Sequence, residues 1–352
     1  MNKTTLMMAF AAMALASCSQ DEPLSINEGR AIDFRPAIGG RATETTNANL
    51  TSITATALLG DANFFTNQTF TKNGEFFTSS HDYYWPGDDS EIQFYAYSPA
   101  TPGGTIEIDK DVKTMTDFSP AAQISDQVDF ITASASGKKS TNEAEGVELT
   151  FSHRLSQIEV QGKTDNDNYS FKVTGVRIGK PISKATFDFA TDAWSPSTDR
   201  AIYEVTYDNP ITLGSQPQTL MATVSGASDN AMLIPQELTP WDPVNDASNQ
   251  AEGTYLSVKL QIVLKESNVQ VYPFPSDANC VWASVPIDKN WEAGNRYVYI
   301  LDFTHGAGYV DPNDPQPGKP VLGGPIKFDV DVTPWVDKTI DEDMTTSSDT
   351  TK

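Results

Sequence analysis

Residues 256–264 read Leu-Ser-Val-Lys-Leu-Gln-Ile-Val-Leu, with an apolar side chain at every second position. Polar side chains, namely Ser257, Lys259 and Gln261, stand between the first four of these apolar residues. Successive side chains of a β-strand point to opposite faces, so the pattern predicts a strand with one buried and one wet face. Such strands are typical of antiparallel sheets that cover a core on one side only.

The same alternation recurs along the rest of the chain. Residues 92–97, 297–303 and 326–332 repeat it, while residues 171–178 change phase at Gly175, which predicts a bulge or a bend. Clusters of Gly, Pro, Asp and Asn separate these runs, and we find no amphipathic helix of useful length and no βαβ rhythm. We therefore expect an all-β chain built from antiparallel β-sandwiches.

The amino-acid composition and the absence of known motifs exclude several classes of function. The chain has 352 residues, with 47 Asp and Glu against 24 Lys and Arg and a net charge of −23. This acidity excludes the basic footprint that nucleic-acid binding needs. No metal-binding, nucleophile-elbow or phosphate-loop motif is present, so we expect no enzymatic activity, no cofactor and no metal site. We interpret His153 as structural and the acidic turns at 165–168 and 311–314 as solvated.

The two ends of the chain differ from its strand-rich body. The ten apolar residues 7–16 are typical of a secretory signal peptide, because a membrane-spanning helix needs about 20. Leu-Ala-Ser-Cys at 15–18 resembles a bacterial lipobox, which would make Cys18 the lipidated first residue; the alternative is an ordinary signal peptide with an incidental cysteine. We interpret the other cysteine, Cys280, as a buried core residue, and expect disorder in residues 341–352.

A short segment ahead of the body carries the most informative pattern. In residues 31–42, Ile32 and Phe34 alternate with charged side chains, as in a short edge strand, and Pro36 is tolerated only at an edge or a bulge. A Gly-Gly pair should then leave Arg41 exposed to proteolysis. A cut there would make the strand separable, and its release would uncover an apolar groove that another strand can fill. The alternative is a flexible linker that alternates by chance.

Several short motifs, each weak alone, follow one another over nearly the whole chain. They are GGRAT at 39–43, YYWP at 83–86, IQFYAY at 92–97, VELTFSHRLSQI at 147–158, WEAGNRYVY at 291–299 and VTPW at 332–335. In this order, and behind a lipobox, they resemble the fimbrillin family (type V pilins, Mfa-like) of anaerobic Gram-negative bacteria.

The resemblance implies two transthyretin-like β-sandwich domains. On this basis we expect a signal peptide (1–17), a lipidated pro-segment with a removable strand (18–41), an N-terminal sandwich (42–146) and a C-terminal sandwich (147–352) with a disordered acidic tail from about 341. The small and polar stretch 133–146 marks the division, either as an interdomain linker or as a long hairpin loop.

The resemblance also implies a fimbrial subunit of the cell surface that contributes to adhesion. It would be exported as an outer-membrane lipoprotein precursor, held to the membrane by the lipid on Cys18 until it is processed. An Arg-specific surface protease would cut between Arg41 and Ala42 and release the strand that carries Ile32 and Phe34. The partners would be other copies or related fimbrial subunits, and the donor strand would come from the region of Val330, Val332, Trp335 and Ile340.

Some points stay open at the level of the sequence. Arg30 is a second candidate cut site, and the poor alternation after Trp335 leaves both the donor strand and the place of the subunit (stalk, tip or anchor) unassigned. A surface-exposed glycan-binding lipoprotein is the alternative function, because aromatic and acidic side chains at a sandwich rim can bind sugars. A hydrolase on a sandwich scaffold is a third.

Overall fold

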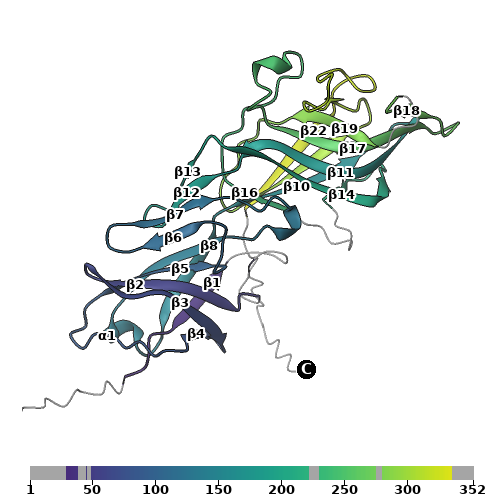
Figure 1. Cartoon of the computed structure of the whole chain (residues 1–352). Coiled ribbons are helices and arrows are strands. Elements are labelled where there is room, and N and C mark those ends of the chain that lie inside the picture. Colours follow the sequence, from purple (N-terminus) through teal and green to yellow (C-terminus); the bar gives the residue numbers. More distant parts are fainter. Residues whose placement is uncertain (1–28, 39–44, 46–48, 222–229, 275–279, 335–352) are drawn as a thin grey trace, which may run out of the picture.

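Strands make up nearly all of the regular structure in the computed structural model of the chain (Figure 1). The residues that the structure describes are 29–38, 45, 49–221, 230–274 and 280–334. The expected signal peptide and acidic tail lie outside them, as do Cys18, Arg41, Ala42, Trp335 and Ile340. The molecule is elongated, with a barrel at one end and two packed sheets at the other (Figure 1). The expectation of an all-β fold is confirmed.

A closed barrel forms the N-terminal end. Its strand order is β1-β4-β3-β2-β5-β8-β9. Gly60 and Gly74 have positive φ angles of 57° and 65° in the tight turns of its first two hairpins, where a side chain would be strained. The barrel strands are β1 (Phe34–Ile38), β2 (Ser52–Leu59), β3 (Ala62–Asn73), β4 (Phe76–Ser79), β5 (Ile92–Ser98), β8 (Ile131–Gly137) and β9 (Val147–His153).

The expected division after Gly146 falls inside this barrel. The strand β9, which we assigned to the second domain, pairs with β8 and, in parallel, with β1. The stretch 133–146 contains most of β8 and the short helix α1 (Lys139–Asn142), so the hairpin interpretation is the one that fits. Small residues in this stretch pack closely against the barrel. A Cβ added to Gly137, for example, would lie 2.8 Å from the Trp85 ring.

Two sheets pack face to face at the C-terminal end. One has the order β15-β10-β20-β22 with β16 also on β10, and the other has the order β14-β11-β17-β19-β21 with β18 also on β17. Their strands are β10 (Ser156–Lys163), β11 (Tyr169–Ile182), β14 (Arg200–Thr212), β15 (Gln218–Thr219), β16 (Ala231–Leu233), β17 (Tyr255–Leu264), β18 (Gln270–Tyr272), β19 (Val281–Pro286), β20 (Asn295–Asp302), β21 (Tyr309–Val310) and β22 (Lys327–Pro334).

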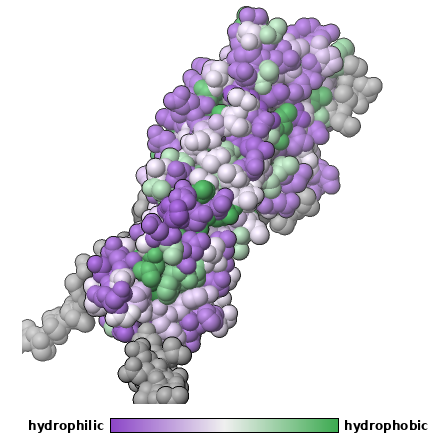
Figure 2. All heavy atoms as spheres, turned by 60° about the vertical axis from the view of Figure 1, so that its left-hand side comes forward, coloured by the Kyte–Doolittle hydropathy of each residue, from purple (hydrophilic) through white to green (hydrophobic). Residues whose placement is uncertain are grey.

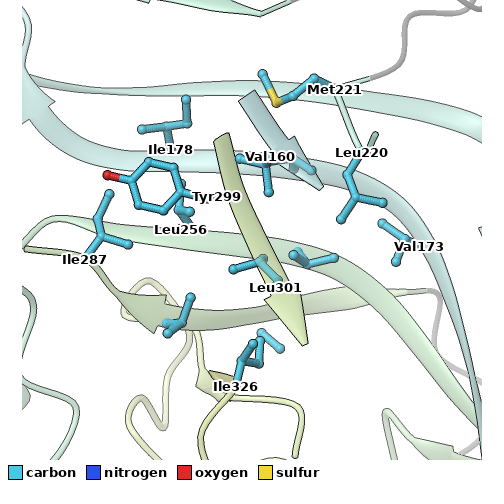
Figure 3. Close-up of a cluster of buried hydrophobic side chains, with 14 of the residues drawn as sticks. Val160, Val173, Ile178, Leu220, Met221, Leu256, Ile287, Tyr299, Leu301 and Ile326 are labelled. Carbon is cyan, nitrogen blue, oxygen red and sulfur yellow. The ribbon is translucent and has the colours of Figure 1, made fainter. Parts of the chain in front are cut away.

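The core between these sheets contains the alternating apolar residues of the sequence. Figure 3 shows side chains from both sheets, among them Val160, Leu256 and Leu301, meeting between the ribbons. The predicted irregularity at Gly175 is confirmed, because the register of β11 shifts there against both neighbouring strands. Most pairs are antiparallel as expected, whereas β1–β9 and β10–β20 are parallel.

A third sheet joins the two ends. It has the order β13-β12-β7-β6, and β7 pairs with β12, which follows it in the chain only after the barrel is complete. A separate apolar core lies against this sheet and includes Phe118, Phe130 and Phe187. The strands are β6 (Thr105–Ile108), β7 (Lys113–Phe118), β12 (Ala185–Asp188) and β13 (Ala193–Pro196), and two 3-10 turns, η1 (Ile124–Asp126) and η2 (Asp246–Ser248), complete the described elements.

The outer surface is mainly polar. Purple, hydrophilic side chains cover most of the face shown in Figure 2, and hydrophobic residues form separate small patches. Among the described residues no helix is long and apolar enough to cross a membrane.

Candidate functional site

The segment that the sequence singled out, residues 31–38, closes the barrel. The strand β1 pairs in parallel with β9 from Phe34↔Val147 to Ile38↔Phe151. Its other neighbour, β4, reaches it only at Phe34↔Phe77. Ahead of the strand, the Ile32 N–H donates to the Tyr83 carbonyl with an N···O distance of 2.7 Å. We call the space between β4 and β9 that this segment fills the β1 groove.

The structure corrects the expectation of an edge strand. At Phe34, β1 lies between two strands, so it is an internal member of the barrel there. Pro36 lies beyond the end of the pairing with β4, where no neighbour on that side needs its missing N–H. The alternation of apolar and polar residues indicates which side chains of a strand are buried. It does not indicate which strands pair, because the partner of β1 is far away in the sequence.

Both apolar side chains of the segment belong to the barrel core. Ile32 is 2% exposed and Phe34 is fully buried. The Phe34 ring meets the Phe70 ring edge-on, with centroids 4.7 Å apart, and the Phe94 ring, with centroids 5.2 Å apart. Burial of a side chain of this size stabilises the folded state by about 1.5–3 kcal/mol. The segment is therefore held mainly by its hydrophobic contacts with the barrel.

A buried carboxylate lies between these two apolar side chains. Asp33 is 6% exposed, and its backbone carbonyl accepts a hydrogen bond from the Val147 N–H at 2.9 Å. One carboxylate oxygen, Oδ2, lies 2.7 Å from Arg30 Nη2, and the other, Oδ1, has no partner among the described residues. Burial raises the pKa of the Asp33 carboxyl, and the Arg30 charge opposes that shift without cancelling it.

Arg30 is itself held in place. Its Nη1 donates to the Ala144 carbonyl at 2.6 Å, and its guanidinium carbon lies 4.5 Å from the centroid of the Phe76 ring. The Arg30 guanidinium thus has an acidic, a carbonyl and an aromatic partner at once. No sequence pattern indicates this arrangement, because Ala144 and Phe76 are far from Arg30 in the chain.

The described part of the C-terminal region forms an edge strand. The strand β22 pairs along its whole length with β20, from Lys327↔Asp302 to Pro334↔Asn295, and no other described strand pairs with it. Val330 is half-buried against the sandwich core, and Val332 is 40% exposed. Of the expected donor residues, Val330 and Val332 are thus on one strand.

Three other interpretations from the sequence can be examined in the structure. His153 is buried, and its Nδ1 lies 2.9 Å from Asp129 Oδ2, which also accepts a hydrogen bond from the Thr45 N–H. The acidic turn at 311–314 is not fully solvated: Asp311 is 3% exposed and accepts a hydrogen bond from the Ser257 hydroxyl at 2.7 Å. Cys280 is half-buried rather than buried.

None of these three groups is part of a recognisable set of reactive side chains. In the part of the chain that the structure describes, no three His, Cys, Asp or Glu side chains come together as metal ligands do. Among the described residues, no aromatic side chain lines the hollow of about 460 Å³ beside Asp129, although aromatic rings are the usual platforms for sugars. The β1 groove is therefore the candidate functional site.

A model of the fimbrillin-like family matches residues 38–335. The chain belongs to this family. The recognition of fimbrillins from the short sequence motifs is thereby confirmed. The family match begins at the last residue of β1 and ends one residue after β22, so it covers the joining sheet, the sandwich and the barrel apart from nearly all of β1.

Individual relatives of this fimbrillin-like protein are distant. It is 22% identical over 368 residues to the fimbrium subunit Fim1C of Phocaeicola vulgatus, an alignment that covers 90% of this chain and 97% of the relative. Its fold is similar to that of a solved fimbrial protein from Bacteroides vulgatus, with a TM-score of 0.59 and 17% identity, covering 87% of this chain and all of the other. At 17% identity, the comparison with the solved structure shows a similar fold and nothing more.

Proposed function

We propose that this fimbrillin-like protein is a non-catalytic structural subunit of a cell-surface fimbria. It is exported as an outer-membrane lipoprotein precursor with lipid on Cys18, and an Arg-specific surface protease cuts it between Arg41 and Ala42. It then assembles with other copies or related subunits by donor-strand exchange and contributes to adhesion. The observation that carries the proposal is the position of Phe34, a core residue of the barrel that lies on the amino-terminal side of the cut.

Cleavage alone would free β1 without expelling it. The released segment would still be held by the contacts of Ile32 and Phe34, which are worth about 1.5–3 kcal/mol each. Once it left, the edge of β9 and the pockets of both side chains would face water, a state that a replacement strand relieves by backbone pairing and burial. The placement of a core strand before a cleavable bond thus supports strand exchange as the route of assembly.

The contacts of Arg30 support Arg41 as the cut site. A trypsin-like protease must take the arginine side chain into its own specificity pocket, and the Arg30 side chain is engaged by Asp33, Ala144 and Phe76. The peptide bond after Arg30 is also followed by Ala31, which forms a bridge with Tyr84. Cleavage there would require the segment to leave the barrel first.

The edge position of β22 supports this strand as the donor. It has a described neighbour on one side only, and no residue from Lys327 to Pro334 is fully buried. Detaching it from its own sheet therefore exposes less apolar surface than detaching any central strand would. Because the β1 groove and β22 lie in different halves of the elongated molecule, exchange would join copies end to end (Figure 1).

Cleavage and assembly can be followed on the unlipidated chain from residue 19. An Arg-specific protease should cut the wild type and the Arg30→Ala variant after residue 41, and both should then form ladders on unboiled SDS gels. The Arg41→Ala variant should stay monomeric. Assembly of Arg41→Ala under the same treatment, or a wild type that loses β1 and never forms oligomers, would overturn donor-strand exchange between copies. A Cys18→Ala precursor that still partitions with membranes would overturn the lipid anchor.

A further inference from the structure

The cations that act on Asp33 leave together with it. Arg30 and Arg35 are the two positive charges that oppose the effect of burial on this carboxylate, and both lie in residues 29–38. On the barrel side, one carboxylate oxygen of the exposed Glu145 lies 3.9 Å from Arg35 Nη1. After the segment is released, neither arginine remains in the groove, so a basic side chain at this place can come only from the incoming strand.

The barrel nevertheless keeps a place for such a side chain. Two of the three partners of the Arg30 guanidinium, the Phe76 ring and the Ala144 carbonyl, belong to the barrel and stay when the segment leaves. An aromatic face with a carbonyl oxygen beside it attracts a guanidinium or an ammonium group, and the attraction grows as the site is shielded from water. These two groups form what we call the cation subsite of the β1 groove.

A glycine shapes the neighbouring position. Gly146 has a φ angle of +72°, and a Cβ added to it would lie 2.6 Å from Asp33 Oδ1 and 3.1 Å from the Phe76 ring. Any other residue at position 146 would be strained and would displace the carboxylate. Next to the cation subsite, the groove thus has room for a polar side chain that is flanked in its strand by two apolar side chains.

We propose that the cation subsite selects the strand that replaces β1. It favours a strand with a basic residue one or two positions ahead of an apolar–acidic–apolar triplet. The precursor's own segment has this order in Arg30 and Ile32-Asp33-Phe34, and β22 has it in Lys327 and Phe328-Asp329-Val330. A second copy of this chain therefore supplies a strand of the required chemistry. The inference rests on the proposed strand exchange and adds what the groove recognises.

The test uses two acetylated peptides, residues 29–38 and residues 325–334, with their Arg30→Ala and Lys327→Ala versions. Each competes with a labelled 29–38 peptide for the chain that has been cut after Arg41 and separated from its own β1 segment, kept dilute, and fluorescence anisotropy gives the affinities. We expect each alanine peptide to bind at least tenfold more weakly than its parent. On a Phe76→Leu chain this difference should shrink to about threefold or less, whereas on a Phe64→Leu chain, changed at another half-buried barrel phenylalanine, it should persist.

The outcomes separate this inference from the proposed function. Parent and alanine peptides that bind equally well to the cut chain would overturn the cation subsite and leave strand exchange standing. A difference that survives Phe76→Leu unchanged would also overturn it, because the preference would then come from elsewhere. Failure of both parent peptides to bind a chain that has lost β1 would instead contradict the exchange on which the inference rests.

Discussion

The ring of Phe34 packs edge-on against the ring of Phe70, with centroids 4.7 Å apart and planes at 73°. Phe70 lies in β3, deep in the barrel, whereas Phe34 lies in the segment that precedes the expected cut. Both side chains are fully buried. A segment whose covalent link to the barrel a single cleavage would break therefore supplies part of the centre of the core, so the uncut chain depends on it for stability.

This dependence predicts the effect of Phe34→Ala on the uncut chain. Truncation of a fully buried phenylalanine removes its burial and leaves a cavity, which costs about 3–5 kcal/mol. Urea denaturation should show that loss in the free energy of unfolding. The control is Phe274→Ala, because Phe274 is 85% exposed and its truncation should change stability by about 0.5 kcal/mol or less. A Phe34→Ala chain as stable as this control would contradict the structure.

Asp33 predicts a pH dependence for the release of the clipped segment. Burial raises the pKa of its carboxyl in the groove, despite the opposing charges of Arg30 and Arg35, and release returns that pKa to its ordinary value near ~4. The Asp33 carboxyl therefore binds a proton more tightly in the docked segment than in the released segment. Docking is strongest below the ordinary pKa and weakens as the pH rises through the raised pKa.

The measurement is the half-life of the docked segment after the cut, followed by size exclusion between pH 4 and pH 8. We expect the half-life to shorten toward high pH in the wild type. In Asp33→Asn the side chain no longer titrates, so the half-life should be nearly constant over that range. A slope that remains in the Asn variant would assign the effect to another group, and a flat wild type would contradict the prediction.

Much of the fold could be predicted because a strand leaves a local period in the sequence. The alternation at 256–264 and 326–332 became β17 and β22, and the phase change at Gly175 became a bulge. Ile32 and Phe34 were recognised as inward-facing by the same rule. What the pattern could not supply was the pairing of β1 with β9, since parallel neighbours are joined only through the whole barrel between them.

The rest of the site depends on contacts that have no sequence signature. The cation subsite combines Phe76 with a backbone carbonyl at Ala144, and a carbonyl looks the same at every position of a sequence. The domain division was misplaced because small polar residues in 133–146 suggested a linker, whereas Ala133 is 3% exposed within β8. Small side chains there reflect close packing in the barrel rather than a solvated connection.

Val332 predicts a way to separate folding from assembly. Because its side chain is 40% exposed at the edge of the sandwich, Val332→Lys should change the stability of the monomer by about 0.5 kcal/mol or less. In a donor strand the same position would enter an apolar groove, where an added charge should abolish SDS-resistant ladders. Val244→Lys, at a position that is 89% exposed, should leave both properties unchanged. Normal ladders from the Val332→Lys chain would remove this residue from the donor strand.

The contacts of Trp194 lead us to predict that this side chain couples the unfolding of the barrel to that of the sandwich. The centroid of its ring lies 4.9 Å from that of the Phe118 ring of β7 and 5.0 Å from that of the Phe187 ring of β12. Its Nε1 donates a hydrogen bond to the Arg154 carbonyl at 2.6 Å. These contacts join strands from both halves of the chain in one sheet. Because the ring is only half-buried, Trp194→Ala should destabilise the chain by about 3 kcal/mol, the low end for tryptophan truncation.

The loss should also change how the chain unfolds. We expect the wild type to melt in one transition by differential scanning calorimetry. With the joining core weakened, the barrel and the sandwich should melt in two. Trp194→Phe keeps an aromatic ring against Phe118 and Phe187 and loses mainly the hydrogen bond, so it should retain a single transition at a slightly lower temperature. Two transitions already present in the wild type would show that the joining sheet does not couple the halves, and an unchanged single transition in Trp194→Ala would show that the coupling lies elsewhere in that sheet.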